Sequence, residues 1–245
     1  MDIKKIKDIL LKEKNNREKG SLYYYSQINF SYNSNRIEGS KLTEEQTESI
    51  YNTHTITIDQ KEIIDTDDII ETKNHFKLFD FILDNVDKDL TIDMILKMHK
   101  ILKRNTTDED NKLMGAGCFK TLPNTIGSIN EVVTVSPKEV ESKLNELIKN
   151  YLELGKMTLE NIIEFHYKFE LIHPFSDGNG RIGRIIMFKE CLKNNILPFI
   201  ISDEHKTFYL RGLNNYKKDK LFLIDTCKNA QDIYEKVCEL LLEEK

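Results

Sequence analysis

The chain has 245 residues, of which 39% are hydrophobic and 31% charged, a balance typical of a globular domain. Its formal net charge of −5 argues against the basic surface that general nucleic-acid binding requires, so we expect no nucleic-acid partner. The apolar runs are far shorter than a membrane-spanning helix, and no apolar segment follows the N-terminus. We therefore expect a cytoplasmic protein with no membrane partner.

Apolar periodicity predicts a mainly helical chain, built as one domain with an N-terminal appendage. In chain order, helices are expected over 1–18, from Thr43, over 65–85, from Thr91 to Leu102, from Ser136, from Thr158 to Ile172, over 181–193, over 204–216 and over 221–244. Between them, the Tyr- and Asn-rich stretch 21–39 is assigned no element, and 53–58 is expected to form a short extended piece. The glycine-punctuated stretch 112–134 predicts a β-hairpin.

Polar capping residues mark several of these helix starts. Thr43 with Gln46 three residues later predicts a capping box. Ser136 followed by Pro137 predicts a cap with proline at the first helical position. Thr158 is also expected to cap a helix, although Asn161 is not expected to complete a capping box.

The four cysteines lie far apart, with no spacing typical of zinc or redox sites. Three of them fall within apolar helical patterns, where free thiols commonly pack as small hydrophobic groups. We therefore expect free thiols that fill core positions rather than a metal or redox site in the set Cys118, Cys191, Cys227 and Cys238.

A dense polar segment separates the two most apolar predicted helices, 158–172 and 181–193. Such helices should lie at the centre of the domain, where burying charge without partners is costly. Pro174 disfavours helical geometry at the preceding residue, so the first helix is expected to end at His173. The polar segment therefore indicates a functional site rather than an ordinary connection.

The start of the second helix has the features of an anion site. Gly178 and Gly180 allow the backbone to approach a bulky ligand and leave amide hydrogens exposed where the helix dipole favours negative charge. Asn179 adds an amide donor between them. A Gly-Asn-Gly sequence on its own, however, is usually a turn.

Ionisable side chains complete this pattern. Arg181 and Arg184 share one helix face, so they can bind phosphate oxygens together. Asp177 supplies a carboxylate of the kind that magnesium prefers, and His173 can accept a proton near neutral pH. Alone, such a histidine is usually a turn residue and such arginines form ion pairs, but together the group predicts a nucleoside triphosphate site with a general base.

The twelve residues 173–184 resemble the Fic signature, which runs His-Pro-Phe, two variable positions, Gly-Asn-Gly-Arg, two variable positions and Arg. This resemblance implies an all-α, mainly helical fold with a short β-hairpin flap, and transfer of AMP from ATP to a protein hydroxyl. It implies that His173 is the base, that Asp177 holds Mg²⁺, and that Phe175 anchors the loop. It further implies that the phosphates are bound by Gly178, Asn179, Gly180, Arg181 and Arg184, with Asn179 also catalytic.

The resemblance also implies a docking site and an adenine pocket. The flap is assigned to residues 117–134, where the target protein, or the protein itself, would add a strand. Many relatives have arginine where this chain has Lys120, and an ordinary surface hairpin is the alternative. Tyr209 lies in a helix that relatives use to line the adenine pocket, although a core tyrosine is an equal alternative.

The segment Ser34 to Gly39 resembles the inhibitory motif of regulated Fic enzymes: Ser or Thr, three variable residues, Glu, then Gly or Asn. We hypothesise that Glu38 pairs with Arg184 and so displaces the γ-phosphate of ATP. The alternative is a surface helix that ends at Gly39. The implied organisation is an N-terminal helical segment with the inhibitory motif (1–60), a Fic core (61–225) and a C-terminal helix (226–245).

Other functions are compatible with parts of this pattern. The same site could transfer another nucleotidyl or phosphoryl group, or remove AMP with the help of Glu38 and His173. The chain could instead be a binding or toxin–antitoxin regulatory protein without catalysis, although the intact His173 and both arginines argue against this. The target and the oligomeric state, a homo-oligomer included, stay open.

Overall fold

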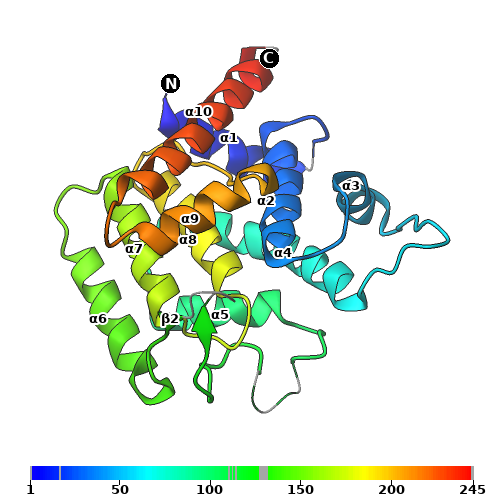
Figure 1. The fold of residues 1–245 in the computed structure, drawn as a ribbon. Helices are drawn as coiled ribbons and strands as arrows, with labels where there is room; N and C mark the ends of the chain where they lie inside the picture. The colour runs from blue at the N-terminus through cyan, green and yellow to red at the C-terminus, as the bar shows by residue number, and fades with distance from the viewer. Residues whose placement is uncertain are drawn as a thin grey trace.

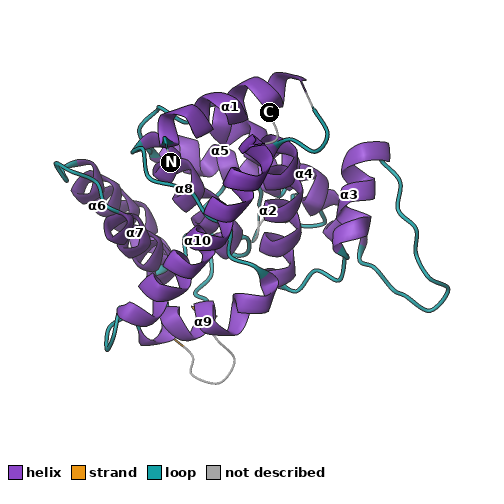
Figure 2. Ribbon diagram, turned by 90° about the horizontal axis from the view of Figure 1, so that it is seen from above, coloured by secondary structure: helices purple, strands orange, loops and turns teal. Residues whose placement is uncertain are grey.

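The computed structural model describes residues 2–16, 18–109, 111, 113, 115–126 and 132–243. Within these ranges the protein consists of α-helices, two 3-10 turns and one short hairpin (Figures 1 and 2). The helices are α1 (Ile3–Asn16), α2 (Leu22–Glu38), α3 (Glu44–Thr53), α4 (Thr66–Asp84), α5 (Ile92–Leu102), α6 (Val140–Leu152), α7 (Leu159–Ile172), α8 (Asn179–Lys193), α9 (Lys206–Asn215) and α10 (Leu221–Glu243). The strands are β1 (Thr125–Ile126) and β2 (Val132–Val133), and the mainly helical fold predicted from the sequence is confirmed.

Helices α7 and α8 lie near the middle of the molecule, with α6 on one flank and α3 on the other (Figure 1). Helix α8 is buried along nearly its whole length, as its continuous apolar pattern predicts. Both chain ends lie on the same side of the molecule, where α1 and α10 pass each other (Figure 1). The segment that joins α7 to α8 is therefore held between two buried helices.

Helix α2 is an element that sequence periodicity did not identify. Ser21 caps it by accepting a hydrogen bond from the backbone of Tyr24, and Gly39 ends it with a left-handed φ of 109°. Its apolar stripe is interrupted because several of its polar side chains are themselves buried. The ring of Phe30 lies 5.4 Å from that of Phe188 in α8, so aromatic packing holds α2 against the centre of the domain.

Most of the expected helix boundaries hold, with three differences. Ser136 makes no side-chain capping bond, and Pro137 opens a 3-10 turn (Pro137–Glu139) before α6 begins at Val140. The Thr158 start does form a capping box, because the Asn161 side-chain oxygen accepts the backbone N–H of Thr158 at 3.0 Å. A shorter amide thus does here what Glu or Gln does in the usual pattern. Residues 53–58 form no strand, since α3 continues to Thr53 and the following residues pair with no neighbour strand within the described chain.

The predicted hairpin forms, with antiparallel pairing of Thr125 with Val133 and of Ile126 with Val132. Each strand has only two residues, and residues 127–131 of the expected flap lie outside the described residues. No helix of the described chain is long and apolar enough to cross a bilayer. The thiols of Cys191, Cys227 and Cys238 are buried, as expected for the three cysteines within apolar helical patterns, and that of Cys118 is exposed.

The three-segment division stays a prediction, but two features of the core bear on it. Side chains of α1 and α2, such as Leu10 and Phe30, share one hydrophobic core with α7 and α8. Helix α10 is continuous across residues 225 and 226. The N-terminal segment therefore packs as part of the same hydrophobic body as the expected core.

Candidate active site

The loop 173–178 begins where α7 ends. His173 closes α7 in a left-handed conformation with φ 50°, and its backbone N–H donates to the carbonyl of Phe169. Pro174 follows at once, so the helix cannot continue, as the sequence indicated. Gly178 then precedes α8 with a φ of 82°, a value that favours glycine. The two helices are thus joined by a sharp turn that brings His173 close to the first residues of α8.

Phe175 anchors this loop in the core, as expected. It is fully buried, and its ring stacks on that of His99 at a centroid distance of 3.9 Å and an angle of 6°. His99 Nδ1 accepts the backbone N–H of Gly117, so Nε2 carries the proton and donates to the carbonyl oxygen of Asp177 at 3.1 Å. Burial lowers the pKa of His99 to about 3, which keeps this ring neutral. A neutral histidine of α5 therefore sets the path of the loop.

The Asn179 side chain also holds the loop. Its Oδ1 accepts the backbone N–H of Phe175, and its Nδ2 donates to the Phe175 carbonyl, both at 2.8 Å. The residue is buried, so these bonds are shielded from water. A phosphate-binding role for the Asn179 amide stays a prediction, whereas its hydrogen bonds to Phe175 are part of the structure.

His173 has the environment of a neutral base. Its Nδ1 atom is buried with no hydrogen-bond partner among the described residues and lies 3.9 Å from a carboxylate oxygen of Glu170. Burial, and after it the positive charge of Lys120, lower the pKa of His173 to about 4. The imidazole is therefore uncharged at neutral pH and able to accept a proton.

Arg181 and Asp177 belong to a buried ion-pair network. Asp177 Oδ2 lies 2.7 Å from both Arg181 Nη2 and Lys103 Nζ, and Glu71 of α4 pairs with both cations. Burial by itself raises the pKa of the Asp177 carboxyl, but the charges of Arg181 and Lys103 outweigh it and hold the pKa well below the usual range. Lys103 also pairs with Asp108 at 2.7 Å. In this state the Arg181 guanidinium binds carboxylates of its own chain.

The donor set suits magnesium that arrives with a nucleotide. Among the described residues no group of three His, Cys, Asp or Glu side chains is placed to hold a metal ion. Both cations lie on Oδ2 of Asp177, and no described side chain donates to Oδ1. Magnesium typically binds through one or two carboxylates plus substrate phosphates and water, which a single partly exposed Asp177 can satisfy.

Arg184 is joined to the N-terminal segment. Its Nη2 donates to Glu38 Oε1 at 2.7 Å and to the Ser34 carbonyl at 2.9 Å, and its Nε lies 3.1 Å from Ser34 Oγ. The arginine side chain is 2% exposed and that of Glu38 is 31% exposed. A Cβ atom at Gly180 would lie 2.3 Å from Glu38 Oε1, so the carboxylate is seated on the first turn of α8. The structure thus contains the expected contact between Glu38 and Arg184.

Tyr209 is buried behind Arg184. The arginine lies over its ring at 5.8 Å, and the tyrosine hydroxyl lies 2.6 Å from His166 Nε2. Glu170 is close by on α7, and burial together with the charge of Glu38 raises its pKa to about 8. The adenine-lining role of Tyr209 stays a prediction, and its described contacts are those of a packed residue.

Sequence reasoning missed Glu71, Lys103 and His99, which come from helices far from the signature. One signal was available, because Glu71 and His75 are polar residues on the stripe of α4 that continues into Leu78 and Phe79. A polar residue on an apolar stripe is buried with a partner when it is buried at all. The partner itself could not be read from local spacing.

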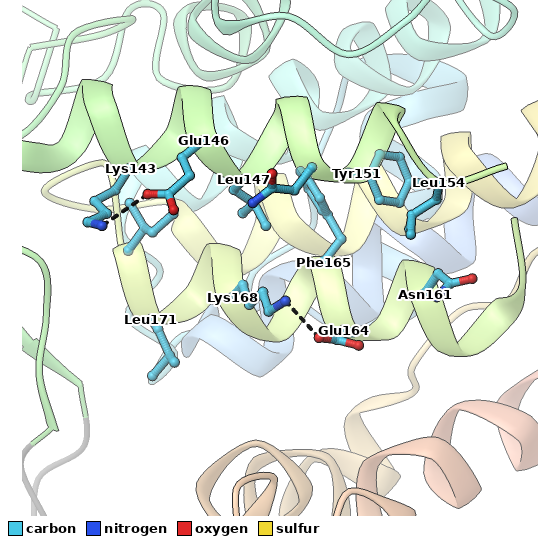
Figure 3. Close-up of a pocket in the computed structure, with 12 residues that line it drawn as sticks. Lys143, Glu146, Leu147, Tyr151, Leu154, Asn161, Glu164, Phe165, Lys168 and Leu171 are labelled. Atoms are coloured by element: carbon cyan, nitrogen blue, oxygen red, sulfur yellow. Dashed lines mark hydrogen bonds and ion pairs between the residues drawn. The ribbon is translucent and has the colours of Figure 1, made fainter.

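A separate groove lies between α6 and α7 (Figure 3). It has a volume of about 450 Å³ and an apolar floor that includes Leu147 and Phe165. Two ion pairs, Lys143 with Glu146 and Lys168 with Glu164, lie on its rims. None of the signature residues lines this groove, so it is distinct from the site beside His173.

The chain is similar to known proteins over most of its length. A protein adenylyltransferase Fic of Nematostella vectensis is 27% identical over 187 residues, which cover 75% of this chain and 42% of that protein. A protein adenylyltransferase Fic of Aedes aegypti is 26% identical over 216 residues, covering 84% of this chain and 41% of that protein. The chain thus spans less than half the length of these relatives.

Solved structures show the same fold. A Fic domain containing signaling protein of Bacteroides thetaiotaomicron matches with a TM-score of 0.75 at 21% identity, over 91% of this chain and 87% of that one. Fic-1 of Caenorhabditis elegans matches with a TM-score of 0.69 at 20% identity, over 96% of this chain and 70% of that one. The model of the Fic/DOC family matches residues 89–191, which include α5, α7 and the whole signature. Residues 89–191 of this chain are therefore similar to the Fic/DOC family, and the chain shares the fold of the solved Fic structures.

Proposed function

We propose that this chain is a protein AMP transferase that uses ATP and is restrained by its own Glu38. The observation that carries the proposal is the pairing of Glu38 with Arg184, beside the start of α8 and the neutral His173. Such a helix start favours phosphate, and a carboxylate of the same chain takes the place of an anion there. The names of the relatives, protein adenylyltransferase, support the same reaction.

In the proposed reaction His173 removes the proton from the target hydroxyl. Since Nδ1 is buried, Nε2 is the nitrogen that would receive this proton. The hydroxyl oxygen forms a bond to the α-phosphorus of ATP while the bond from that phosphorus to the pyrophosphate oxygen breaks. AMP remains on the protein and pyrophosphate leaves. The contribution of the site comes mainly from positioning and from charges fixed in advance.

Each remaining residue has a place in this proposal. The backbone N–H groups of Gly178, Asn179 and Gly180 bind phosphate oxygens at the start of α8. Asp177 holds magnesium, which when bound neutralises the α- and β-phosphates, and Arg181 acts through its ion pair with Asp177 as well as toward phosphate. 

Arg184 binds the γ-phosphate once Glu38 leaves it. The hairpin 117–134, of which 127–131 lie outside the described residues, receives the target backbone. The protein itself is a candidate target. We propose the cytoplasm as its location, and a homo-oligomer stays a prediction.

The test is incubation with labelled ATP, GTP, UTP and CDP-choline, comparing wild type with Glu38→Gly and His173→Ala, followed by mapping of modified residues. We expect Glu38→Gly to incorporate AMP from ATP much faster than wild type, and His173→Ala to incorporate none. Preference for another nucleotide, or labelling that survives His173→Ala, would overturn the proposed reaction.

Removal of AMP is a second candidate, because the Glu38 carboxylate lies directly on the first turn of α8. Protein modified by the Glu38→Gly variant would be isolated and returned to unlabelled wild type. Release of AMP that needs both Glu38 and His173 would establish this activity, and a stable label would exclude it.

A further inference from the structure

Lys120 is a buried cation without a carboxylate partner among the described residues. Its side chain is 3% exposed, and its Nζ donates to three neutral oxygens. These are Asn124 Oδ1 at 2.7 Å, Thr134 Oγ1 at 2.6 Å and the carbonyl of Ile172 at 3.2 Å. Burying an ammonium in this way is costly, since no opposite charge offsets the lost hydration.

The three acceptors belong to three different segments. Asn124 directly precedes β1, Thr134 directly follows β2, and Ile172 is the last residue of α7. One ammonium therefore joins both ends of the hairpin to the end of the helix that carries His173. The backbone of Lys120 adds a further hydrogen bond to the same loop, since its N–H donates to the carbonyl of Pro174 at 2.9 Å.

The same ammonium acts on His173 through its charge. The charged and titratable groups that influence the imidazole are Lys120 from the hairpin base, Glu170 from α7, Glu38 from α2 and Asp177 from the loop. Lys120 is the cation in this set and disfavours a protonated ring, whereas the charges of Glu38 and Asp177 and the backbone of Glu170 favour it. Burial lowers the pKa of Lys120 itself to about 8, so the ammonium is still largely charged at neutral pH.

We propose that Lys120 is a positioning residue that fastens the hairpin to the His173 loop and places a positive charge near the imidazole. The inference rests on the proposed function for what the hairpin and His173 do. Its two consequences are separable. The hydrogen bonds fix the strand edge on which a target would pair, and the charge adds to burial in lowering the pH above which the base is active.

The test uses three variants in the Glu38→Gly background. Lys120→Met removes both the charge and the hydrogen bonds, Lys120→Arg retains both, and Thr134→Val removes one acceptor while the charge stays. Histidine side-chain NMR gives the pKa of His173, with its signal assigned from His173→Gln. Amide exchange of Thr125, Ile126, Val132 and Val133 reports on the hairpin. Both measurements are made without nucleotide, so they are independent of whether AMP transfer is the reaction.

For Lys120→Met we expect the pKa of His173 to rise by about 0.5–1 unit. The acid limb of the pH profile of the AMP-transfer rate should shift to higher pH by the same amount. We also expect faster exchange of the hairpin amides and a KM for the protein target raised about 3- to 10-fold. Lys120→Arg should leave the pKa of His173 as it is with Lys120, and Thr134→Val should speed exchange of the hairpin amides without changing the pKa of His173. An unchanged His173 pKa and unchanged hairpin exchange in a folded Lys120→Met protein would overturn the inference.

If these NMR results hold but no nucleotide is transferred, the positioning role stands and the proposed reaction fails. If AMP transfer is found but Lys120→Met leaves both NMR measurements unchanged, the reaction stands and the positioning role fails. Where Lys120→Met does not fold, Lys120→Arg and Thr134→Val decide. Lys120→Arg must then retain the His173 pKa, and Thr134→Val must speed hairpin exchange, or the inference is wrong.

Discussion

Replacing Glu38 tests the contact with Arg184 that is proposed to restrain AMP transfer. The Glu38–Arg184 bond is charge-assisted, 2.7 Å long, and one partner is almost fully buried. Hydrogen bonds to charged groups contribute about 1.5–3 kcal/mol, which corresponds to a factor of about 10–150 in the fraction of Arg184 free to bind phosphate. Glu38→Ala should therefore raise the rate of AMP transfer by about that factor.

The same substitution should alter stability in a way that ATP reverses. Without Glu38, the buried Arg184 keeps Ser34 as a partner but loses its carboxylate, so we expect a loss of about 1–3 kcal/mol in the free energy of unfolding. ATP with magnesium should then raise the melting temperature of Glu38→Ala more than that of wild type, because phosphate supplies the missing negative charge.

The assay is the initial rate of labelled AMP incorporation, paired with thermal unfolding with and without ATP. Glu38→Gln keeps an acceptor oxygen without the charge, so its rate should fall between those of wild type and Glu38→Ala. Glu146→Gln, on the exposed rim of the α6–α7 groove, is the matched control and should change neither rate nor ATP stabilisation. Equal rates for wild type and Glu38→Ala, with equal ATP stabilisation, would refute the reasoning.

Three further results are expected from unfolding measurements. Gly180→Ala should destabilise wild type by about 1–3 kcal/mol, because the new Cβ would lie 2.3 Å from Glu38 Oε1; a double-mutant cycle should show a smaller loss in Glu38→Ala, and equal losses would argue against the clash. Glu71→Ala should cost about 1.5–3 kcal/mol in urea unfolding, because it removes one of the two carboxylates that Lys103 and Arg181 share and leaves Asp177 as the other; a loss below about 1 kcal/mol would contradict a buried network. The buried histidines His75, His99 and His166 each have a pKa of about 3 in the folded protein, so the unfolded chain takes up their protons first as the pH falls. Below about pH 6.5 the free energy of unfolding should therefore fall by up to about 1.4 kcal/mol per pH unit for each of them. Replacing any one of the three by Gln or Phe should make the free energy of unfolding depend less steeply on pH.

Local sequence determined most of the helices and the chemistry at the centre of the site. The end of α7 at His173 follows from Pro174, and the left-handed turn before α8 follows from Gly178. These features depend on residues a few positions apart, which spacing alone reveals. The pairing of Glu38 with Arg184 was also anticipated, but from a family resemblance rather than from spacing.

Only the tertiary structure decided which groups meet across long stretches of chain. Arg181 pairs with Glu71 110 residues away, and Lys120 reaches the carbonyl of Ile172 52 residues away. Helix α2 escaped periodicity because it is surrounded by protein, so its buried polar residues find partners on other helices. Periodicity reports which face of an element is buried, whereas the identity of a buried charge's partner depends on how the helices pack.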